Sequence, residues 1–227
     1  MDIIEQLELF ADKLGDLCEE MVIVGGCSPA LILDIDTAPD LRPTDDVDVI
    51  VQADNYGKYI KFIGKIKERG FVEKVGDRIG RYICGDLVVD IIPSEHDVVG
   101  FTNKWYKKAF ANAVYQKLPS GKSVKTVSSV YFIATKLEAF RDRGENDPWA
   151  SSDLEDIITM LVESTNFEAE FEQADGDVQE YISREFKRLV SNENYPHFLS
   201  GHLRGDEASQ AALPDLRRLI ERIASII

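Results

Sequence analysis

The stretch Arg42-Pro-Thr-Asp-Asp-Val-Asp-Val-Ile-Val51 carries the pattern that decides the fold. Its apolar second half is typical of a β-strand, and side chains two residues apart on a strand lie on the same face, roughly 7 Å apart. Asp46 and Asp48 therefore share one face. Two carboxylates this close repel each other unless a positive charge lies between them, and a divalent cation with oxygen ligands would supply it. The alternative is a polar strand edge with both carboxylates in water.

A glycine turn precedes this strand, in Met21-Val-Ile-Val-Gly-Gly-Cys-Ser-Pro-Ala-Leu-Ile-Leu33. A short β-type run leads into Gly25 and Gly26, and an apolar, helix-like segment begins after Ser28 and Pro29. Serine before a helix and proline in its first turn are typical of a helix start. The free backbone N–H groups at such a start favour phosphate. This order of elements predicts a phosphate-binding turn beside a metal site.

A third carboxylate is expected on a neighbouring strand, in Asp86-Leu-Val-Val-Asp-Ile-Ile-Pro93. Asp90 stands among β-branched residues, where a buried carboxylate without a partner would cost several kcal/mol. Metal coordination would remove that cost, whereas a half-exposed strand would place Asp90 in water. Asp86, after Gly85, is expected in a turn. Of the three histidines, His96 has the best claim to a catalytic role because it follows this strand.

Together these residues resemble the nucleotidyltransferase superfamily typified by DNA polymerase β. Its signature is a strand ending in a glycine pair, a helix, a strand with two carboxylates one residue apart, and a third carboxylate on a later strand. The resemblance implies an α+β fold with a mixed β-sheet flanked by helices. It also implies that Asp46, Asp48 and Asp90 hold two Mg²⁺ ions, with Mn²⁺ as an alternative, and serve in catalysis.

A second pattern lies between Ser128 and Glu163. Lys136 and Arg143 share one helix face, and after a breaker run Asp153 and Asp156 share one face of the next helix. With the glycine turn and the carboxylates, this resembles the second signature of the AbiEii/AbiGii-type nucleotidyltransferases, many of them toxins of toxin–antitoxin pairs. The resemblance assigns Lys136 to the triphosphate and Asp153 to a catalytic or site-ordering role. The alternative is an ordinary salt-bridged helical hairpin.

The resemblance implies transfer of a nucleoside monophosphate from an NTP, such as ATP, to an acceptor hydroxyl, with release of pyrophosphate. Nucleotide binding would then involve Gly25, Gly26, Ser28, Thr44 and Lys136. One departure stands out: Cys27 follows the glycine pair where many relatives carry Ser or Thr, and a thiol is a weak hydrogen-bond donor. This departure favours a second hypothesis, a catalytically silent relative that binds a nucleotide or a protein partner. A third is an unrelated fold whose acidic clusters are solvated.

Composition indicates a soluble, cytoplasmic protein. The 227 residues are 44% hydrophobic, enough for a substantial core, and no stretch approaches the roughly 20 apolar residues of a membrane span. The N-terminal residues do not resemble a signal peptide, and the three cysteines are expected as free thiols. The net charge of −15 argues against a broad nucleic-acid surface. Lysines in 104–108 and 117–125 could still contact a single strand or a tRNA end. A tRNA, a protein and a small molecule all remain candidate acceptors, and an antitoxin is a candidate partner.

The chain is expected to form two parts, with the boundary near Ser128. Residues 1–127 are predicted to form the α/β nucleotidyltransferase core, and residues 128–227 a helical domain that completes the nucleotide cleft. In the first part, hydrophobic periodicity predicts helices and short strands. The predicted helices are 2–20 and 56–69, and the predicted strands are 71–75, 78–84, 87–92, 113–118 and 123–127.

Overall fold

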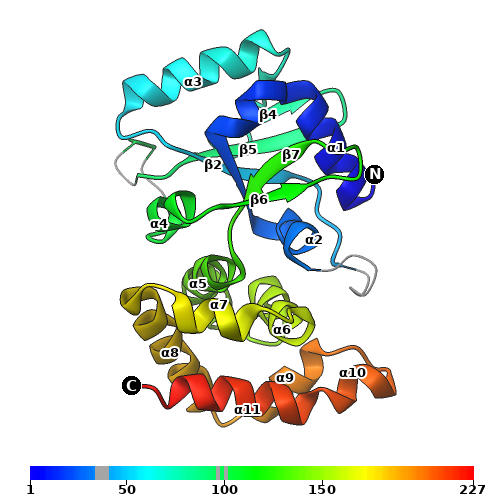
Figure 1. Cartoon of the computed structure of the whole chain (residues 1–227), viewed down its shortest axis with the longest axis vertical. Helices are drawn as coiled ribbons and strands as arrows, with labels where there is room; N and C mark the ends of the chain where they lie inside the picture. The colour runs from blue at the N-terminus through cyan, green and yellow to red at the C-terminus, as the bar shows by residue number, and fades with distance from the viewer. Residues whose placement is uncertain (34–40, 96–97, 100–101) are drawn as a thin grey trace. The chain divides into compact units, whose positions relative to one another are not determined.

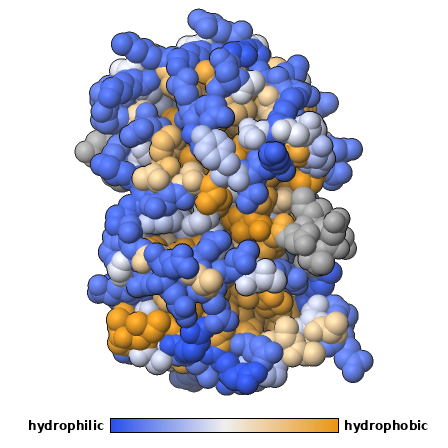
Figure 2. Space-filling view, viewed as in Figure 1, coloured by the Kyte–Doolittle hydropathy of each residue, from blue (hydrophilic) through white to orange (hydrophobic). Residues whose placement is uncertain are grey.

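The computed structural model describes residues 1–33, 41–95, 98–99 and 102–227 (Figure 1). His96 lies outside these ranges, so its predicted role is not tested. The chain divides into two compact units, Met1–Ser128 and Ser129–Ile227. Within the described part, no helix is both long and apolar enough to cross a bilayer. On the face drawn in Figure 2, hydrophilic side chains predominate and apolar side chains form smaller areas.

The first unit is built around one mixed β-sheet. In the described residues its seven strands have the order β3-β4-β5-β2-β1-β7-β6. Strands β2 and β5 are parallel, as are β1 and β7, and the other neighbours are antiparallel. The elements of this unit are α1 (Ile3–Leu14), η1 (Gly15–Glu20), β1 (Met21–Val24), η2 (Gly25–Cys27), α2 (Pro29–Ile32), β2 (Val47–Val51), α3 (Tyr56–Glu68), β3 (Val72–Glu73), β4 (Arg81–Cys84), β5 (Leu87–Pro93), α4 (Tyr106–Ala111), β6 (Val114–Lys117) and β7 (Ser123–Thr126).

The second unit is helical, which confirms the α+β class with a helical C-terminal part. Its elements are α5 (Ser129–Ala139), the π-helical turn η4 (Phe140–Gly144), α6 (Ser152–Glu163), α7 (Phe167–Gln173), α8 (Gly176–Val190), α9 (Tyr195–His202), α10 (Glu207–Ala211) and α11 (Leu213–Ala224). Helix α11 packs along α8, and α5 contacts both α6 and α8.

The alternation of residues along β2 and β5 separates a core face from a polar face. Val47 and Val49 on β2 and Val89 on β5 belong to one hydrophobic core, which also contains residues of α1 and α3. The aspartates at the even positions point to the opposite face. In the parallel register Asp48 lies directly opposite Asp90. The prediction that the two strands are neighbours is therefore confirmed, and both carboxylates lie on the face away from this core.

The predicted first helix is too long. The α-helix begins after the N-cap Asp2, whose side chain forms a capping box with Glu5, but it ends at Leu14. Gly15 adopts a φ of +55°, and the chain continues as the 3₁₀ segment η1. A left-handed residue cannot continue an α-helix, and glycine adopts that conformation without steric cost. The apolar periodicity runs through this break, which is why it misled the prediction.

Two smaller differences concern the other elements of the first unit. The segment predicted as strand 71–75 pairs only at Val72–Glu73. The basic segment 104–108, for which the sequence predicted no helix, runs into helix α4. By contrast, the turn at Gly85 and Asp86 joins β4 to β5 as expected, with Cys84 paired to Leu87.

Candidate active site

The glycine turn brings Gly25 against the carboxylate of Asp48. Val24, the last residue of β1, pairs with Asp48 on β2, and Gly25 follows with a φ of +69°. A Cβ atom on Gly25 would lie only 2.2 Å from Oδ2 of Asp48. The Asp48 carboxylate therefore occupies the space that glycine leaves free. The predicted neighbourhood of turn and carboxylate exists in the structure.

Thr44 lies over the second glycine and contacts the first aspartate. A Cβ atom on Gly26 would lie 3.2 Å from Oγ1 of Thr44. The Thr44 hydroxyl lies 3.2 Å from Oδ1 of Asp46 and 3.3 Å from the Asp46 carbonyl oxygen. Thr44 thus braces the loop before β2 and orients Asp46. Whether Thr44 also contacts a nucleotide stays a prediction.

Cys27 and Ser28 both point into the protein. The Cys27 thiol donates to the Asp46 carbonyl oxygen at 3.4 Å, and the Ser28 hydroxyl donates to the Ile23 carbonyl oxygen at 3.4 Å. Burial, followed by the charges of Asp48 and Asp46, raises the pKa of the Cys27 thiol well above its ordinary value. Ser28 stands at the N-cap position of α2 with Pro29 in the first turn, as expected, but its side chain makes no capping bond and the helix spans only four residues.

The three predicted metal ligands come together in part. Asp48 and Asp90 are direct neighbours on β2 and β5, and Asp46 lies one residue before β2. Among the described residues, no group of three or more His, Cys, Asp or Glu side chains is arranged to hold a metal ion. An arginine lies between two of the carboxylates.

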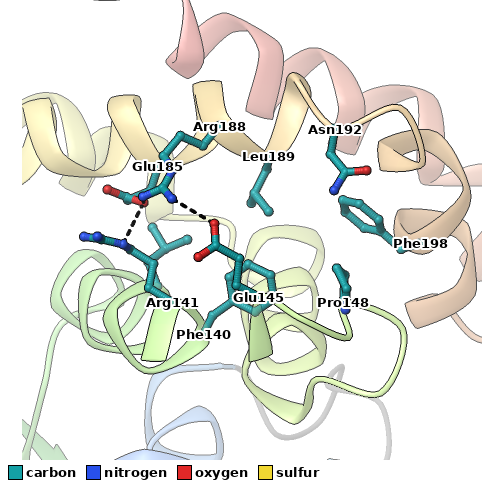
Figure 3. A pocket seen from close by; sticks show the side chains of 10 residues that line it. Phe140, Arg141, Glu145, Pro148, Glu185, Arg188, Leu189, Asn192 and Phe198 are labelled. Atoms are coloured by element: carbon teal, nitrogen blue, oxygen red, sulfur yellow. Dashed lines mark hydrogen bonds and ion pairs between the residues drawn. The ribbon is translucent and has the colours of Figure 1, made fainter. Parts of the chain in front are cut away.

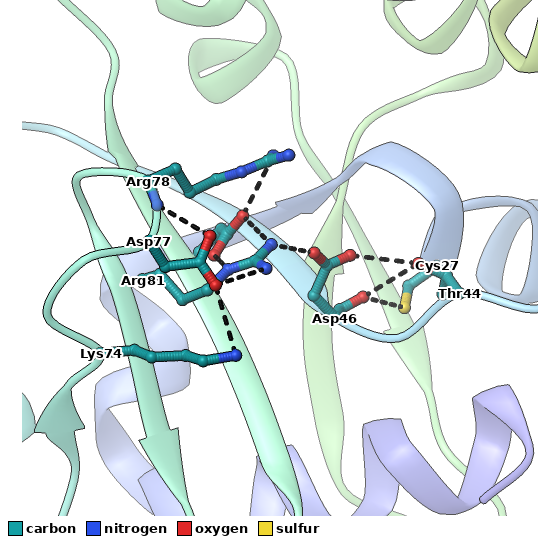
Figure 4. A network of polar contacts seen from close by, with 8 residues as sticks. Cys27, Thr44, Asp46, Lys74, Asp77, Arg78 and Arg81 are labelled. Carbon is teal, nitrogen blue, oxygen red and sulfur yellow. Dashed lines mark hydrogen bonds and ion pairs between the residues drawn. The ribbon is translucent and has the colours of Figure 1, made fainter.

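Arg81 joins Asp46 to Asp90. Its Nε lies 2.7 Å from Oδ1 of Asp90 and its Nη2 lies 2.8 Å from Oδ2 of the same carboxylate, a bidentate pair. The same Nη2 donates to Oδ2 of Asp46 (Figure 4). Arg78 adds a contact of 3.3 Å from its Nη1 to Asp90. The hydrogen bonds to Asp90 raise the pKa of Arg81 further above its ordinary value, so the guanidinium stays protonated.

The role of Arg81 was missed from the sequence, although a signal for it exists. The two-residue turn at Gly85 and Asp86 sets the register of the β4–β5 hairpin. Counting outward from that turn places Arg81 opposite Asp90, as the structure shows. A buried aspartate that requires a positive partner could have been matched to this arginine before a metal was invoked.

In the helical unit, the four residues of the second signature form one ion-pair network. Nζ of Lys136 lies 2.6 Å from Oδ2 of Asp156 and 3.1 Å from Oδ1 of Asp153. Arg143 makes a bidentate pair with Asp153 at 2.7 and 2.9 Å. The network links α5 and η4 to α6, which is the arrangement that the salt-bridged hairpin hypothesis expects. Catalytic roles for Lys136 and Asp153 stay predictions.

Burial and ion pairing act on Asp153 in opposite directions. Burial disfavours the charged carboxylate, but hydrogen bonds from Arg143 and the charges of Lys136 and Arg143 outweigh it and hold the pKa of Asp153 below the ordinary 3.8. Asp153 is therefore ionised at neutral pH and contributes to the cohesion of the helices.

The helical unit also contains a small pocket of about 50 Å³ (Figure 3). Its wall is partly apolar, with Phe140 and Leu189, and partly charged, with Arg188 paired to Glu145 at 2.8 Å. A space of this size holds a few water molecules and is too small for a nucleotide. None of the predicted site residues lines it.

Three of the six lysines considered for nucleic-acid contact have acidic or carbonyl partners nearby. Nζ of Lys107 lies 2.8 Å from Glu95, Lys122 pairs with Asp12, and Lys125 donates to the Glu19 carbonyl oxygen. These partners reduce the local excess of positive charge that binding to a phosphate backbone requires.

Comparisons with known proteins give little further information. The chain matches no protein-family model, and no curated protein matches it. A crystal structure of an H. pylori protein, provisionally described as a nucleotidyltransferase, has a TM-score of 0.44 and 13% identity, over 98% of this chain and 96% of that chain. A likeness at this level assigns neither a family nor a function to the chain.

Proposed function

We propose that this chain is a metal-dependent nucleotidyltransferase that moves a nucleoside monophosphate from an NTP to an acceptor hydroxyl and releases pyrophosphate. The observation that carries the proposal is the position of Asp48. Its carboxylate lies against Gly25 of the glycine turn and directly opposite Asp90 on the parallel neighbour strand. A glycine turn beside two facing carboxylates is the arrangement that the resemblance to the nucleotidyltransferase signature implies, and such carboxylates could hold the metal ions that the transfer uses.

The donor chemistry at this position fits a hard divalent cation. Asp46, Asp48 and Asp90 provide only carboxylate oxygens, the ligands that Mg²⁺ and Mn²⁺ prefer. A positively charged group, Arg81, already lies against two of the three, so the position is suited to a cation. Bound there, divalent ions would neutralise charge on the triphosphate and lower the pKa of the acceptor hydroxyl.

The chain's own residues would position the substrate around these carboxylates. Gly25 and Gly26, without side chains, allow phosphate groups to approach the backbone closely. Thr44 would keep Asp46 in its orientation through the hydrogen bond that it already makes. Lys136 would add positive charge for the triphosphate, with Asp153 ordering it, as the resemblance to the AbiEii/AbiGii type implies.

A catalytically silent nucleotide- or partner-binding protein is the second candidate. Two observations favour it: Arg81 bridges Asp46 and Asp90, and the Cys27 thiol is buried and donates to the Asp46 carbonyl oxygen. The enzyme proposal includes a role as the toxin of a toxin–antitoxin pair. Its candidate acceptors are a tRNA, a protein and a small molecule.

Transfer assays with labelled NTPs test the proposed function. We expect the purified protein, with Mg²⁺ and each labelled NTP in turn, to release pyrophosphate and to label an acceptor in total RNA, protein or small-molecule fractions. Asp46→Asn and Asp48→Asn should each abolish turnover, because each removes a carboxylate charge from the proposed metal site. Asp45→Asn is the matched control, since Asp45 is the exposed neighbour in the same loop.

The outcomes separate the two candidates. Turnover that persists in Asp46→Asn or Asp48→Asn would contradict the assignment of the site. A protein that gains thermal stability from Mg²⁺ and an NTP but never releases pyrophosphate would support the silent relative.

A further inference from the structure

Arg81 makes more contacts with carboxylates, and is less exposed, than an arginine in an ordinary surface ion pair. Its guanidinium spans both oxygens of Asp90 and reaches Oδ2 of Asp46. Only 14% of the Arg81 side chain and 3% of the Asp90 side chain are exposed. Because the pair is shielded from water and from salt, its electrostatic attraction is stronger than at an open surface.

The backbone directs Arg81 to this place. Gly80, which precedes it, has a φ of +89°, and a Cβ atom on Gly80 would lie 2.6 Å from the Ile91 carbonyl oxygen. The Gly80 carbonyl in turn accepts a hydrogen bond from the Ile91 amide at 2.8 Å. Only glycine allows this approach of β4 to β5. The position of Arg81 opposite Asp90 is thus built into the hairpin.

The network around Arg81 balances its charges. Its contacts join the carboxylates of Asp46, Asp77 and Asp90 to Arg78, Arg81 and Lys74 (Figure 4), three negative groups to three positive ones. Of the three cations, Arg81 alone contacts all three carboxylates.

We propose that Arg81 is the resident counter-cation of the carboxylate cluster, and that a divalent metal ion binds Asp46 and Asp90 only by displacing its guanidinium. This inference rests on the proposed function, because it concerns the regulation of the same site. The guanidinium occupies Oδ2 of Asp46 and both oxygens of Asp90, and a metal ion that bridges these two carboxylates would bind at the same oxygens. Binding of one therefore excludes binding of the other at those atoms.

Displacement makes metal binding depend on the nucleotide. A metal ion alone must compete with an attached, shielded arginine. A triphosphate offers the released guanidinium an alternative bidentate partner, so it favours the displaced state. Metal and triphosphate then bind cooperatively, and each increases the affinity for the other by the same factor.

Binding of Mn²⁺ alone, without any nucleotide, tests the inference. The free ion is measured by electron paramagnetic resonance at low ionic strength, with full-length wild-type protein and the variant Arg81→Ala. We expect Arg81→Ala to bind Mn²⁺ at least about tenfold more tightly, since removal of the guanidinium leaves two poorly compensated carboxylates. Mn²⁺ should also raise the melting temperature of Arg81→Ala more than that of the wild type.

Three further variants make the result specific. Arg69→Ala is the matched control: it removes an arginine paired to Asp16 at the surface, and it should leave Mn²⁺ affinity unchanged. Arg81→Ala with Asp90→Asn should lose the gain. Arg81→Lys keeps the charge but loses the bidentate fork, and it should bind Mn²⁺ more tightly than the wild type by a smaller factor, which provides the test if Arg81→Ala does not fold.

Two results would overturn the inference. The first is that Arg81→Lys, and Arg81→Ala if it folds, bind Mn²⁺ no more tightly than the wild type. The second is that the gain in Mn²⁺ affinity persists when Asp90→Asn is added. Because these measurements need no turnover, they are independent of the transfer assay. A gain in Mn²⁺ affinity without any nucleotidyl transfer would retain the counter-cation and reject the proposed enzyme. Nucleotidyl transfer without a gain in Mn²⁺ affinity would retain the proposed enzyme and reject Arg81 as the counter-cation.

Discussion

At the scale of single residues, the candidate site depends on one backbone conformation. Gly25 combines a φ of +69° with a contact that leaves no room for a side chain beside Asp48. Left-handed backbone costs an L-residue roughly 1–2 kcal/mol before any clash is counted. The glycine is therefore required for the position of Asp48 as well as for the turn.

We predict that Gly25→Ala lowers the free energy of unfolding by about 2 kcal/mol, because strain and the clash with Asp48 add together. Urea denaturation measures the change. Gly64→Ala is the control: Gly64 lies within α3 with nothing within 4 Å of a built Cβ atom. That substitution should raise stability by roughly 0.5–1 kcal/mol. Equal effects at the two positions would refute the role given to Gly25.

At the scale of secondary-structure elements, buried ion pairs connect the first helices of the second unit. Side chains on α5 and η4, Lys136 and Arg143, hold Asp153 at the start of α6, and only 2% of the Asp153 side chain is exposed. Loss of the Asp153 charge would leave the buried Lys136 with Asp156 as its partner, while Arg143 is largely exposed, so the cost is that of the lost hydrogen bonds to Asp153. The network therefore stabilises the packing of α5 and η4 against α6, whether or not its residues also take part in catalysis.

We predict that Asp153→Asn lowers the free energy of unfolding at pH 7 by about 2 kcal/mol, because the charge-assisted hydrogen bonds from Lys136 and Arg143 are weakened. The pKa of Asp153 is lower in the folded protein than in the unfolded chain. Its contribution is therefore complete above the unfolded value and is lost as pH falls through the folded value. The difference between wild type and variant should shrink below pH 3.8, the ordinary aspartate value.

Urea denaturation from pH 7 to pH 3 checks this expectation. Asp142→Asn, at an exposed position of η4, should change stability by no more than about 0.5 kcal/mol at any pH. A pH-independent difference for Asp153→Asn would show that the carboxylate charge does not stabilise the helices.

At the scale of the whole molecule, the three thiols report on the integrity of the first unit. Cys18 and Cys27 are buried, whereas Cys84 is partly accessible. Burial, with the charge of Glu19, raises the pKa of Cys18 to about 11, and burial raises that of Cys27 still further. Since the thiolate is the reactive form, both buried thiols should be inert in the folded protein.

We predict that an aromatic disulfide reagent at pH 8 modifies Cys84 rapidly and Cys18 and Cys27 only at the rate at which the first unit opens. The released chromophore measures one fast equivalent and two slow ones. Cys84→Ser should remove the fast phase alone, and urea should make all three fast. Rapid reaction of every thiol without denaturant would contradict the buried positions.

The spacing of residues was sufficient to predict much of this architecture. The Asp-x-Asp strand, the glycine turn and the Asp90 strand were predicted because periodicity and turn chemistry act over a few neighbouring residues. The same local signals predicted that the aspartates of α6 share one face, and both pair with Lys136. The predicted end of the first helix was wrong, because the α-helix ends before Gly15 although the apolar pattern continues beyond it.

Local geometry was enough to predict which segments form strands and helices, which carboxylates share a face, and that the glycine turn lies beside them. The contacts of Arg81 with Asp46 and Asp90 join segments that are distant along the chain, and they appeared only in the folded structure. A buried carboxylate requires a positive partner, and both a metal ion and an arginine satisfy that requirement. Strand pairing between distant segments made that choice and placed an arginine where the sequence alone suggested a metal ion.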